Sequence, residues 1–321
     1  MLTPSLSTPP LFAALASARN VLIAGAGGGF DVYAGLPLAF ALWESGVRVH
    51  LANLSFSELE LVDREFWTAQ HVVAVTPDSV SPDWYFPEGT LARWLAAHDL
   101  PSTVYAFPPL GVQSLREAYR HLIDTLDLDA VVLVDGGTDI LLRGDENGLG
   151  TPVEDVTSLA AVAGLDVPVK LVTCLGFGID AHDGVSHVQV LENIAALDRD
   201  GGYLGALSIP GTSREATLYR EAVADAAAAT PQRPSIVQGQ IAAATAGMFG
   251  DVQFTSRTRG STLFINPLMA MYFTVSLDKL AARCLYLPLI EPTYGRRQVI
   301  TRIDSFRATL PTTRIPRAYP H

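Results

Sequence analysis

The chain has little of what marks several common classes of protein. It has only two cysteines, Cys174 and Cys284, which exclude a disulfide framework, and we expect both to be buried, reduced thiols. Charged residues make up only 17% of the chain and the net charge is −11, which argues against a nucleic-acid backbone as the main partner, since proteins that bind one carry a basic face. No apolar run reaches the roughly 18–20 residues that span a bilayer. No basic residue precedes the first short apolar run, so we expect a cytoplasmic protein without a signal peptide.

What is present is an alternation of strand-like and helix-like segments, in a chain that is 49% apolar. This alternation predicts βαβ units and a three-layer α/β/α fold with a mostly parallel, Rossmann-like sheet. Strands are expected at 20–24, 47–54, 71–75, 103–107, 130–134, 169–175, 262–265, 270–275 and 285–290. Helices are expected at 36–43, 91–98, 115–126, 156–163, 188–197, 214–229, 241–248 and 277–283, with turns at 201–211.

We expect one domain over residues 1–321, and the alternative is a boundary near residue 165. The first ~18 and last ~20 residues should be peripheral. From Arg283 onward there are seven arginines, with only Glu291 and Asp304 against them. These arginines fit a solvated tail, a contact in the homo-oligomer that we expect, or an anion site, because guanidinium pairs well with carboxylate and phosphate.

The first candidate loop runs from Gly25 to Asp31, reads GAGGGFD, and follows the strand at 20–24. Its glycines allow positive φ and close approach of a ligand to the backbone, as in phosphate and nucleotide sites. Phe30 stands where a dinucleotide motif has its third glycine, and Asn53 stands near the place of the ribose-binding acid, so NAD(P) is the less favoured cofactor. Asp31 is either catalytic or a helix cap, and the loop could also be only a tight turn. The residues expected to contact a ligand are Gly25, Gly27, Gly28, Gly29 and Phe30.

The second loop, from Asp135 to Asp155, reads DGGTDILLRGDENGLGTPVED and follows the buried strand at 130–134. Ligands of an open parallel sheet bind beyond the carboxyl ends of its strands. Acids at that edge can bind a divalent cation, hold sugar hydroxyls or transfer protons. A solvated loop in which Arg143 pairs with a neighbouring acid is the alternative. We expect Asp135 and Asp139 to be catalytic and to bind Mg²⁺ or Mn²⁺ together with Glu146. The expected ligand contacts are Gly136, Gly137 and Thr138.

The third loop, residues 176–187, reads GFGIDAHDGVSH and follows the strand at 169–175. Two histidines and two aspartates here could be metal ligands or an acid–base pair. We expect His182 and Asp183 to be catalytic and Gly178 to contact the ligand; the alternative is a polar turn. In the stretch 235–251, Gln238, Gln240 and Asp251 could also touch a ligand, although packing explains the small residues there equally well.

The stretches VLIAGAGGGFDVYAGLPLAFAL, VDGGTDILLRGDENGLGTPVED and LGFGIDAHDG resemble a bacterial and archaeal family known only as a domain of unknown function. The resemblance runs from about residue 20 to about residue 300 and implies a Rossmann-like fold without an assigned activity. The short run DGGTD is also similar to the DGGN/E run of D-glutamate cyclase-like lyases, from which Thr138 departs.

These observations favour an enzyme acting on a small polar metabolite, such as a nucleotide, nucleoside or sugar phosphate. It would be a hydrolase or lyase with acid–base carboxylates and a divalent cation. The alternatives are an NAD(P)-dependent oxidoreductase, a non-catalytic nucleotide-binding or regulatory protein, and a cyclase-like hydro-lyase. All of them require the three loops to meet at one edge of the sheet.

Overall fold

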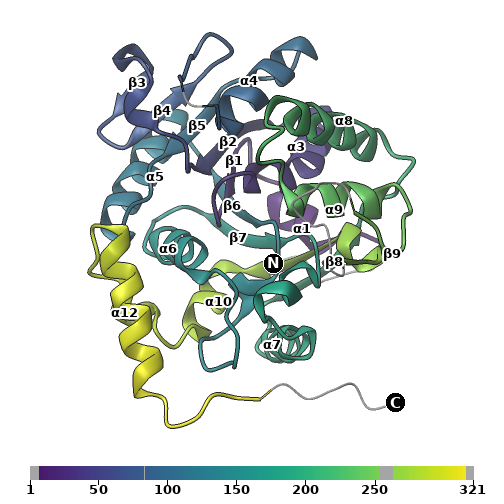
Figure 1. Cartoon of the computed structure of the whole chain (residues 1–321). Helices are drawn as coiled ribbons and strands as arrows, with labels where there is room; N and C mark the ends of the chain where they lie inside the picture. The colour runs from purple at the N-terminus through teal and green to yellow at the C-terminus, as the bar shows by residue number, and fades with distance from the viewer. Residues whose placement is uncertain (1–6, 83, 254–262, 316–321) are drawn as a thin grey trace.

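The computed structural model describes residues 7–82, 84–253 and 263–315 of the chain. Within these residues, nine strands form one sheet that lies at the centre of the molecule (Figure 1). In spatial order they are β3 (Trp67–Ala69), β4 (Val72–Val75), β5 (Val104–Phe107), β2 (Arg48–Leu54), β1 (Asn20–Gly25), β6 (Ala130–Asp135), β7 (Val169–Cys174), β11 (Met271–Ser276) and β8 (Tyr203–Ser208). A separate antiparallel pair joins β9 (Gly250–Asp251) to β10 (Phe264–Ile265).

The five central strands, β5, β2, β1, β6 and β7, are parallel, while the strands at both edges pair antiparallel. The chain moves outward from β1 through β2 to β5, and later continues on the other side of β1 with β6 and β7. The direction therefore reverses between β1 and β6, and such a switch point is where open α/β sheets bind ligands. The predicted Rossmann-like α/β fold with a mostly parallel sheet is confirmed.

Both faces of the sheet are buried, which explains why the central strands read as continuous apolar runs. Along β1, Val21 and Ile23 belong to one core and Leu22 and Ala24 to the other, because successive side chains of a strand point to opposite faces. The first face is covered by α1 (Pro10–Leu15), α2 (Asp31–Ala34), α3 (Leu36–Glu44), α4 (Pro87–Ala97), α8 (Arg214–Ala229) and α9 (Ile236–Thr245). The second face is covered by α5 (Val112–Leu126), α6 (Pro152–Ala163), α7 (His187–Arg199) and α10 (Leu277–Arg283).

The prediction of a strand at 285–290 is wrong. This stretch forms the short helix α11 (Leu287–Ile290), which packs with α6 and α12 (Arg296–Thr309) around a third core. A six-residue apolar run does not distinguish a strand from a buried helical turn, and Pro288 suits the first turn of a helix. Figure 1 shows α12 as a long helix at one side of the molecule.

The stretch predicted as turns at 201–211 contains the edge strand β8. Its side chains are largely half-buried or exposed, so it lacks the apolar run that identified the central strands. Thr262, the first residue of one predicted strand, lies outside the described residues, and β10 begins at Phe264.

The sheet is continuous across residue 165, since β6 and β7 pair on either side of it. Both cysteines are buried free thiols. None of the described helices is long and apolar enough to cross a membrane.

Candidate functional site

Three aspartates from three segments converge at the switch point between β1 and β6. Asp31 begins α2 just after β1, Asp135 ends β6, and Asp155 lies in the first turn of α6. Each places one carboxylate oxygen so that the three oxygens all lie within 4.8 Å of one another. Asp135 and Asp155 are buried, with exposed fractions of 4% and 2%, and Asp31 is half-buried. We name these three residues the aspartate triad.

Glycine at position 27 allows two of these carboxylates to meet. A Cβ on Gly27 would lie 2.6 Å from Oδ2 of Asp31 and 2.8 Å from Oδ1 of Asp155, closer than side-chain atoms tolerate. The Gly27 N–H also donates a hydrogen bond of 2.7 Å to Oδ2 of Asp31. The loop after β1 thus shapes the triad directly.

Most backbone N–H groups of this loop donate hydrogen bonds within the protein. The N–H of Ala26 donates to the carbonyl oxygen of Val134, and the N–H of Gly29 donates to that of Leu54. With the Gly27 N–H bound to Asp31, the N–H groups of two of the residues predicted to contact a ligand, Gly27 and Gly29, already have acceptors. The loop therefore fits an acid-binding turn better than a phosphate cradle. Gly25 packs against Asn53, and Phe30 is buried before α2.

Two further aspartates border the triad, each held by a backbone N–H. Oδ2 of Asp139 accepts from the Thr151 N–H at 2.8 Å, and Oδ2 of Asp180 accepts from the Thr138 N–H at 2.6 Å. The adjacent glycines again make room, because a Cβ on Gly137 would lie 2.6 Å from Oδ1 of Asp180. The loops after β1, β6 and β7 therefore meet in one place, as the sequence predicted.

Burial and mutual repulsion raise the pKa values of all five aspartates. Loss of water and the Asp139 carboxylate raise the pKa of Asp31 from 3.8 to about 7, against the hydrogen bond from Gly27. Burial, followed by weaker effects that include Asp183, raises the pKa of Asp139 to about 6. Burial and the neighbouring acids also raise the pKa values of the remaining three well above their usual range; these are Asp135, Asp155 and Asp180.

Within the described part of the chain, this group of acids lacks a positively charged partner. Among the described residues, none of the five aspartates forms an ion pair with a lysine or arginine. Oδ1 of Asp155 is buried without a hydrogen-bond partner in the structure. Divalent cations bind carboxylate oxygens at about 2.0–2.6 Å, so opposite ligands of one ion lie about 4–5 Å apart. The spacing of the triad matches that requirement.

The predicted catalytic residues of the third loop lie at the surface beside the site. His182 and Asp183 are both exposed on the short turn 179–183, and the charge of Asp183 is near enough to raise the pKa of Asp139. Gly178 precedes this turn with φ at 93° and packs against His187. The prediction that His182 and Asp183 move protons remains untested.

A family model described as a protein of unknown function, DUF1152, matches residues 22–303. The chain belongs to the DUF1152 family. No match was found among curated proteins. The family match confirms the resemblance seen in the sequence and carries no activity with it.

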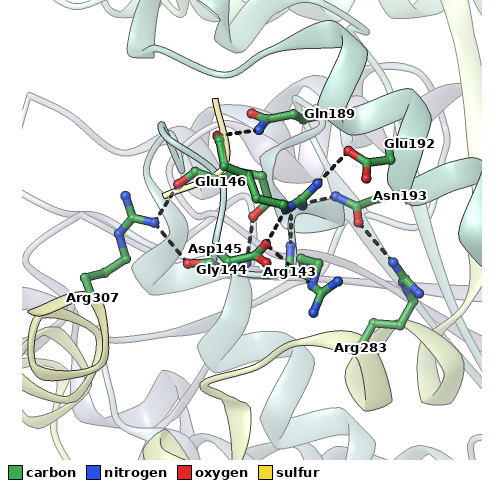
Figure 2. A network of polar contacts seen from close by, with 10 residues as sticks. Arg143, Gly144, Asp145, Glu146, Gln189, Glu192, Asn193, Arg283 and Arg307 are labelled. Carbon is green, nitrogen blue, oxygen red and sulfur yellow. Dashed lines mark hydrogen bonds and ion pairs between the residues drawn. The ribbon is translucent and has the colours of Figure 1, made fainter. Parts of the chain in front are cut away.

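Glu146 does not join the triad of this DUF1152 chain, and it lies in a separate polar network (Figure 2). Its carboxylate is fully buried and accepts four hydrogen bonds. The donors are the N–H groups of Arg143 and Gly144, Nδ2 of Asn193 at 2.8 Å, and a guanidinium nitrogen of Arg314 at 2.7 Å. A carboxylate with this many donors has a structural role, so the geometry speaks against its predicted metal role.

The arginine-rich C-terminal segment is held by this network. Arg314 also pairs with Asp145 and Glu192, and Arg307 donates to the Glu146 carbonyl oxygen. Arg296, at the start of α12, pairs with Glu154. Arg296 and Arg314 therefore bind acids of the same chain, Arg307 binds backbone carbonyl oxygens, and together they dock the segment.

Two acids of the site, Asp155 and Asp180, are not among the residues singled out from the sequence. Asp155 stands in the motif DGGTD…ED, and an acid in the first turn of a helix that follows a glycine loop is a usable signal. Gln238, for which the sequence leaves open a ligand contact or packing, also borders the site. Gln238, on α9, is 1% exposed; its Oε1 accepts from the Tyr219 hydroxyl at 2.7 Å, and its Nε2 has no partner in the structure. This nitrogen and Oδ1 of Asp31 both lie within 3.0 Å of the point where a Cβ on Gly136 would stand.

Proposed function

We propose that this protein is a divalent-cation-dependent enzyme acting on a small polar metabolite that carries phosphate or several hydroxyl groups, by hydrolysis or elimination. The observation that carries this proposal is the aspartate triad, with its oxygens within 4.8 Å at the switch point of the sheet. Buried like charges repel one another unless a cation or protons neutralise them. A site of this kind is costly to the fold, which favours a functional reason for it.

Asp31, Asp135 and Asp155 would hold Mg²⁺ or Mn²⁺, hard cations that prefer oxygen ligands. The bound ion would supply a Lewis acid that polarises a phosphoryl or hydroxyl oxygen of the substrate. Asp139 is the candidate for proton transfer, because its pKa of about 6 lies near the pH at which a general acid or base works best. Burial is the main cause of that raised pKa, and the neighbouring carboxylate of Asp183 adds to it.

The alternatives gain less support from the geometry. An NAD(P) site would need an acid at the end of β2, where Asn53 instead donates to the carbonyl oxygen of Gly29 and to Glu88. A regulatory nucleotide-binding protein would use the same site without turnover. Nothing in the site favours the cyclase-like hydro-lyase over other lyases. The homo-oligomeric state and the cytoplasmic location stay predictions.

The test is calorimetric titration of chelator-treated protein with MnCl₂, followed by a turnover screen of nucleotides, nucleosides and sugar phosphates. We expect one strong Mn²⁺ site in the wild type and its loss in Asp135→Asn. On any substrate found, turnover should fall by at least about 100-fold in that variant, the scale on which such catalytic groups act.

The matched control is Asp124→Asn, which makes the same change on the exposed side of α5 and should keep both properties. Unchanged Mn²⁺ binding by a folded Asp135→Asn protein would remove the triad from consideration. Cation binding with no turnover on any compound would favour the regulatory alternative.

A further inference from the structure

A cavity of about 330 Å³ lies beside the triad, between α2, α8 and α9. Its walls are mainly apolar and include Phe30 and Val223, several alanines of α8 and α9, and Met248 at its rim. Two of its lining residues, Phe30 and Gln238, also border the triad: Phe30 immediately precedes Asp31, and Gln238 reaches Gly136. The cavity and the triad therefore share a boundary.

Gln238 at this boundary has an unused hydrogen-bond donor. The Tyr219 hydroxyl fixes its Oε1, so Nε2 faces the neighbourhood of Asp31 and Gly136 with no acceptor in the structure. Buried N–H groups are paired in the great majority of native proteins, and an unpaired one in a pocket is a sign of a missing partner. An acceptor atom of a ligand would complete it.

We propose that the cavity binds the base of a nucleoside or nucleotide whose sugar and phosphate reach the triad, an inference that rests on the proposed function. Pockets for small molecules combine apolar walls with a few placed polar groups, and they begin at about 300 Å³. The alanine methyl groups and the Phe30 ring offer apolar surface to the faces of a planar ring. Gln238 donates to an acceptor where base and sugar join.

The cavity is unsuited to a second anionic group. Its one charged lining residue, Arg220, already donates to the carbonyl oxygens of Gly211 and Thr245 at 3.0 and 3.2 Å and to the Thr217 hydroxyl. A sugar phosphate without a base would leave these apolar walls in contact with water. The site thus selects base-bearing substrates over sugar phosphates.

The test compares ligands that differ only by the base. We expect the Mn²⁺-loaded full chain to bind AMP or UMP at least about 10-fold more tightly than ribose 5-phosphate by calorimetry, because burying a ring in an apolar pocket discriminates on that scale. Gln238→Glu, which keeps an acceptor for the Tyr219 hydroxyl but loses the donor, should also weaken nucleotide binding.

A matched pair of variants on α8 locates the base. Ala227 is half-buried and lines the cavity, whereas the next residue, Ala228, is exposed. Ala227→Leu should lower nucleotide affinity at least about 10-fold and leave ribose 5-phosphate binding unchanged, while Ala228→Leu should change neither. Ala242→Leu, which fills the cavity from α9, serves if Ala227→Leu does not fold.

The outcomes separate this inference from the proposed function. Equal affinity for ribose 5-phosphate and both nucleotides, no binding of either nucleotide, or an unchanged nucleotide affinity in the two cavity-filling variants overturns the base pocket and leaves the Mn²⁺ site standing. A wild-type protein that does not bind Mn²⁺ overturns the proposed function itself.

Discussion

The stretch that follows β6 supplies buried acids to two regions that treat them in opposite ways. In one, Glu146 accepts four hydrogen bonds, including one from the Arg314 guanidinium. In the other, Asp135 accepts a single long bond of 3.4 Å from Ile140, and Asp155 keeps one oxygen unpaired. Both regions remove carboxylates from water, which costs several kcal/mol per ion. Among the described residues, only the first region offsets that cost with a counter-charge.

The difference separates structural acids from functional ones. A carboxylate that is fully paired locks two segments together, whereas a group of unpaired carboxylates remains available to a cation or a proton. Each region can therefore be tested by a substitution that should affect one property and spare the other.

The largest effect is expected from Arg314→Ala, which removes the charged partner of Glu146. We expect unfolding in urea to become easier by ~2–3 kcal/mol, because one partner of a buried ion pair is left without its counter-charge. The expected loss of stability is smaller than for a fully buried ion pair, because three other donors still bind Glu146 and because Arg314 is partly exposed. The midpoint of urea unfolding, at an unchanged slope, is the measurement.

Arg302→Ala is the control, since Arg302 is exposed on α12, the helix that precedes Arg314 in the chain, and should change stability by less than ~0.5 kcal/mol. Mn²⁺ affinity should be the same in both variants. If Arg314→Ala unfolds at the same urea concentration as Arg302→Ala, the Glu146 network is not the structural element that we describe.

The opposite result is expected for Asp135→Asn. In the presence of a chelator at pH 8, this variant should be more stable than the wild type by ~1–2 kcal/mol, because it removes one of several buried like charges. Added Mn²⁺ should stabilise the wild type by mass action, by about 2.7 kcal/mol at 100 times the dissociation constant, and should leave the variant unchanged.

Thermal unfolding with and without Mn²⁺ gives both quantities, and Asp124→Asn should behave as the wild type does. A metal-free Asp135→Asn protein that is less stable than the wild type would show that Asp135 supports the fold instead of straining it. The two regions would then not differ in kind.

The sequence predicts where Asp31 and Asp135 lie, but it does not predict the network around Glu146 or the position of Gln238. Asp31 and Asp135 follow β1 and β6, whose apolar runs are readable because both faces of the sheet are covered. That reading places both acids at one edge. It does not show that β1 and β6 are neighbours, which is a property of the topology.

Contacts between distant segments decide the rest. Glu146 and Arg314 are 168 residues apart, so no local pattern distinguished Glu146 from Asp135. Gln238 comes from α9, which packs against α8 and reaches the site only through tertiary structure. Asp155 was readable in principle, because its helix follows the loop directly. The sequence predicts that the glycines of the first loop shape the site, but Gly27 makes room for carboxylates and not for a phosphate.

The smallest effect is expected for a third buried acid, Glu88. Its pairing is intermediate between that of Glu146 and that of the triad. It is fully buried in the first turn of α4 and accepts from Nδ2 of Asn53 at 2.6 Å and from the Ser57 hydroxyl at 3.3 Å, but it has no ion pair among the described residues. Burial raises its pKa above 4.5, and the hydrogen bond from Asn53 opposes that shift. Hydrogen bonds from these neutral donors thus stabilise the ionised carboxylate less than water does.

For a carboxyl group with a raised pKa in the folded state, the native protein binds more protons than the unfolded chain between the two pKa values. Its contribution to stability is complete below pH 4.5 and is lost as the pH rises through the folded-state pKa. Glu88→Gln cannot ionise, so its free energy of unfolding relative to the wild type should increase between pH 5 and pH 8. We expect the increase to stay below ~1 kcal/mol, since hydrogen bonds from Asn53, Ser55 and Ser57 already stabilise the charge. Urea unfolding of both proteins at the two pH values measures this increase.

A difference in the free energy of unfolding that is constant or shrinks with pH would mean that neutral hydrogen bonds stabilise a buried carboxylate as well as Arg314 does. The absence of a counter-charge would then no longer mark the triad as a cation site.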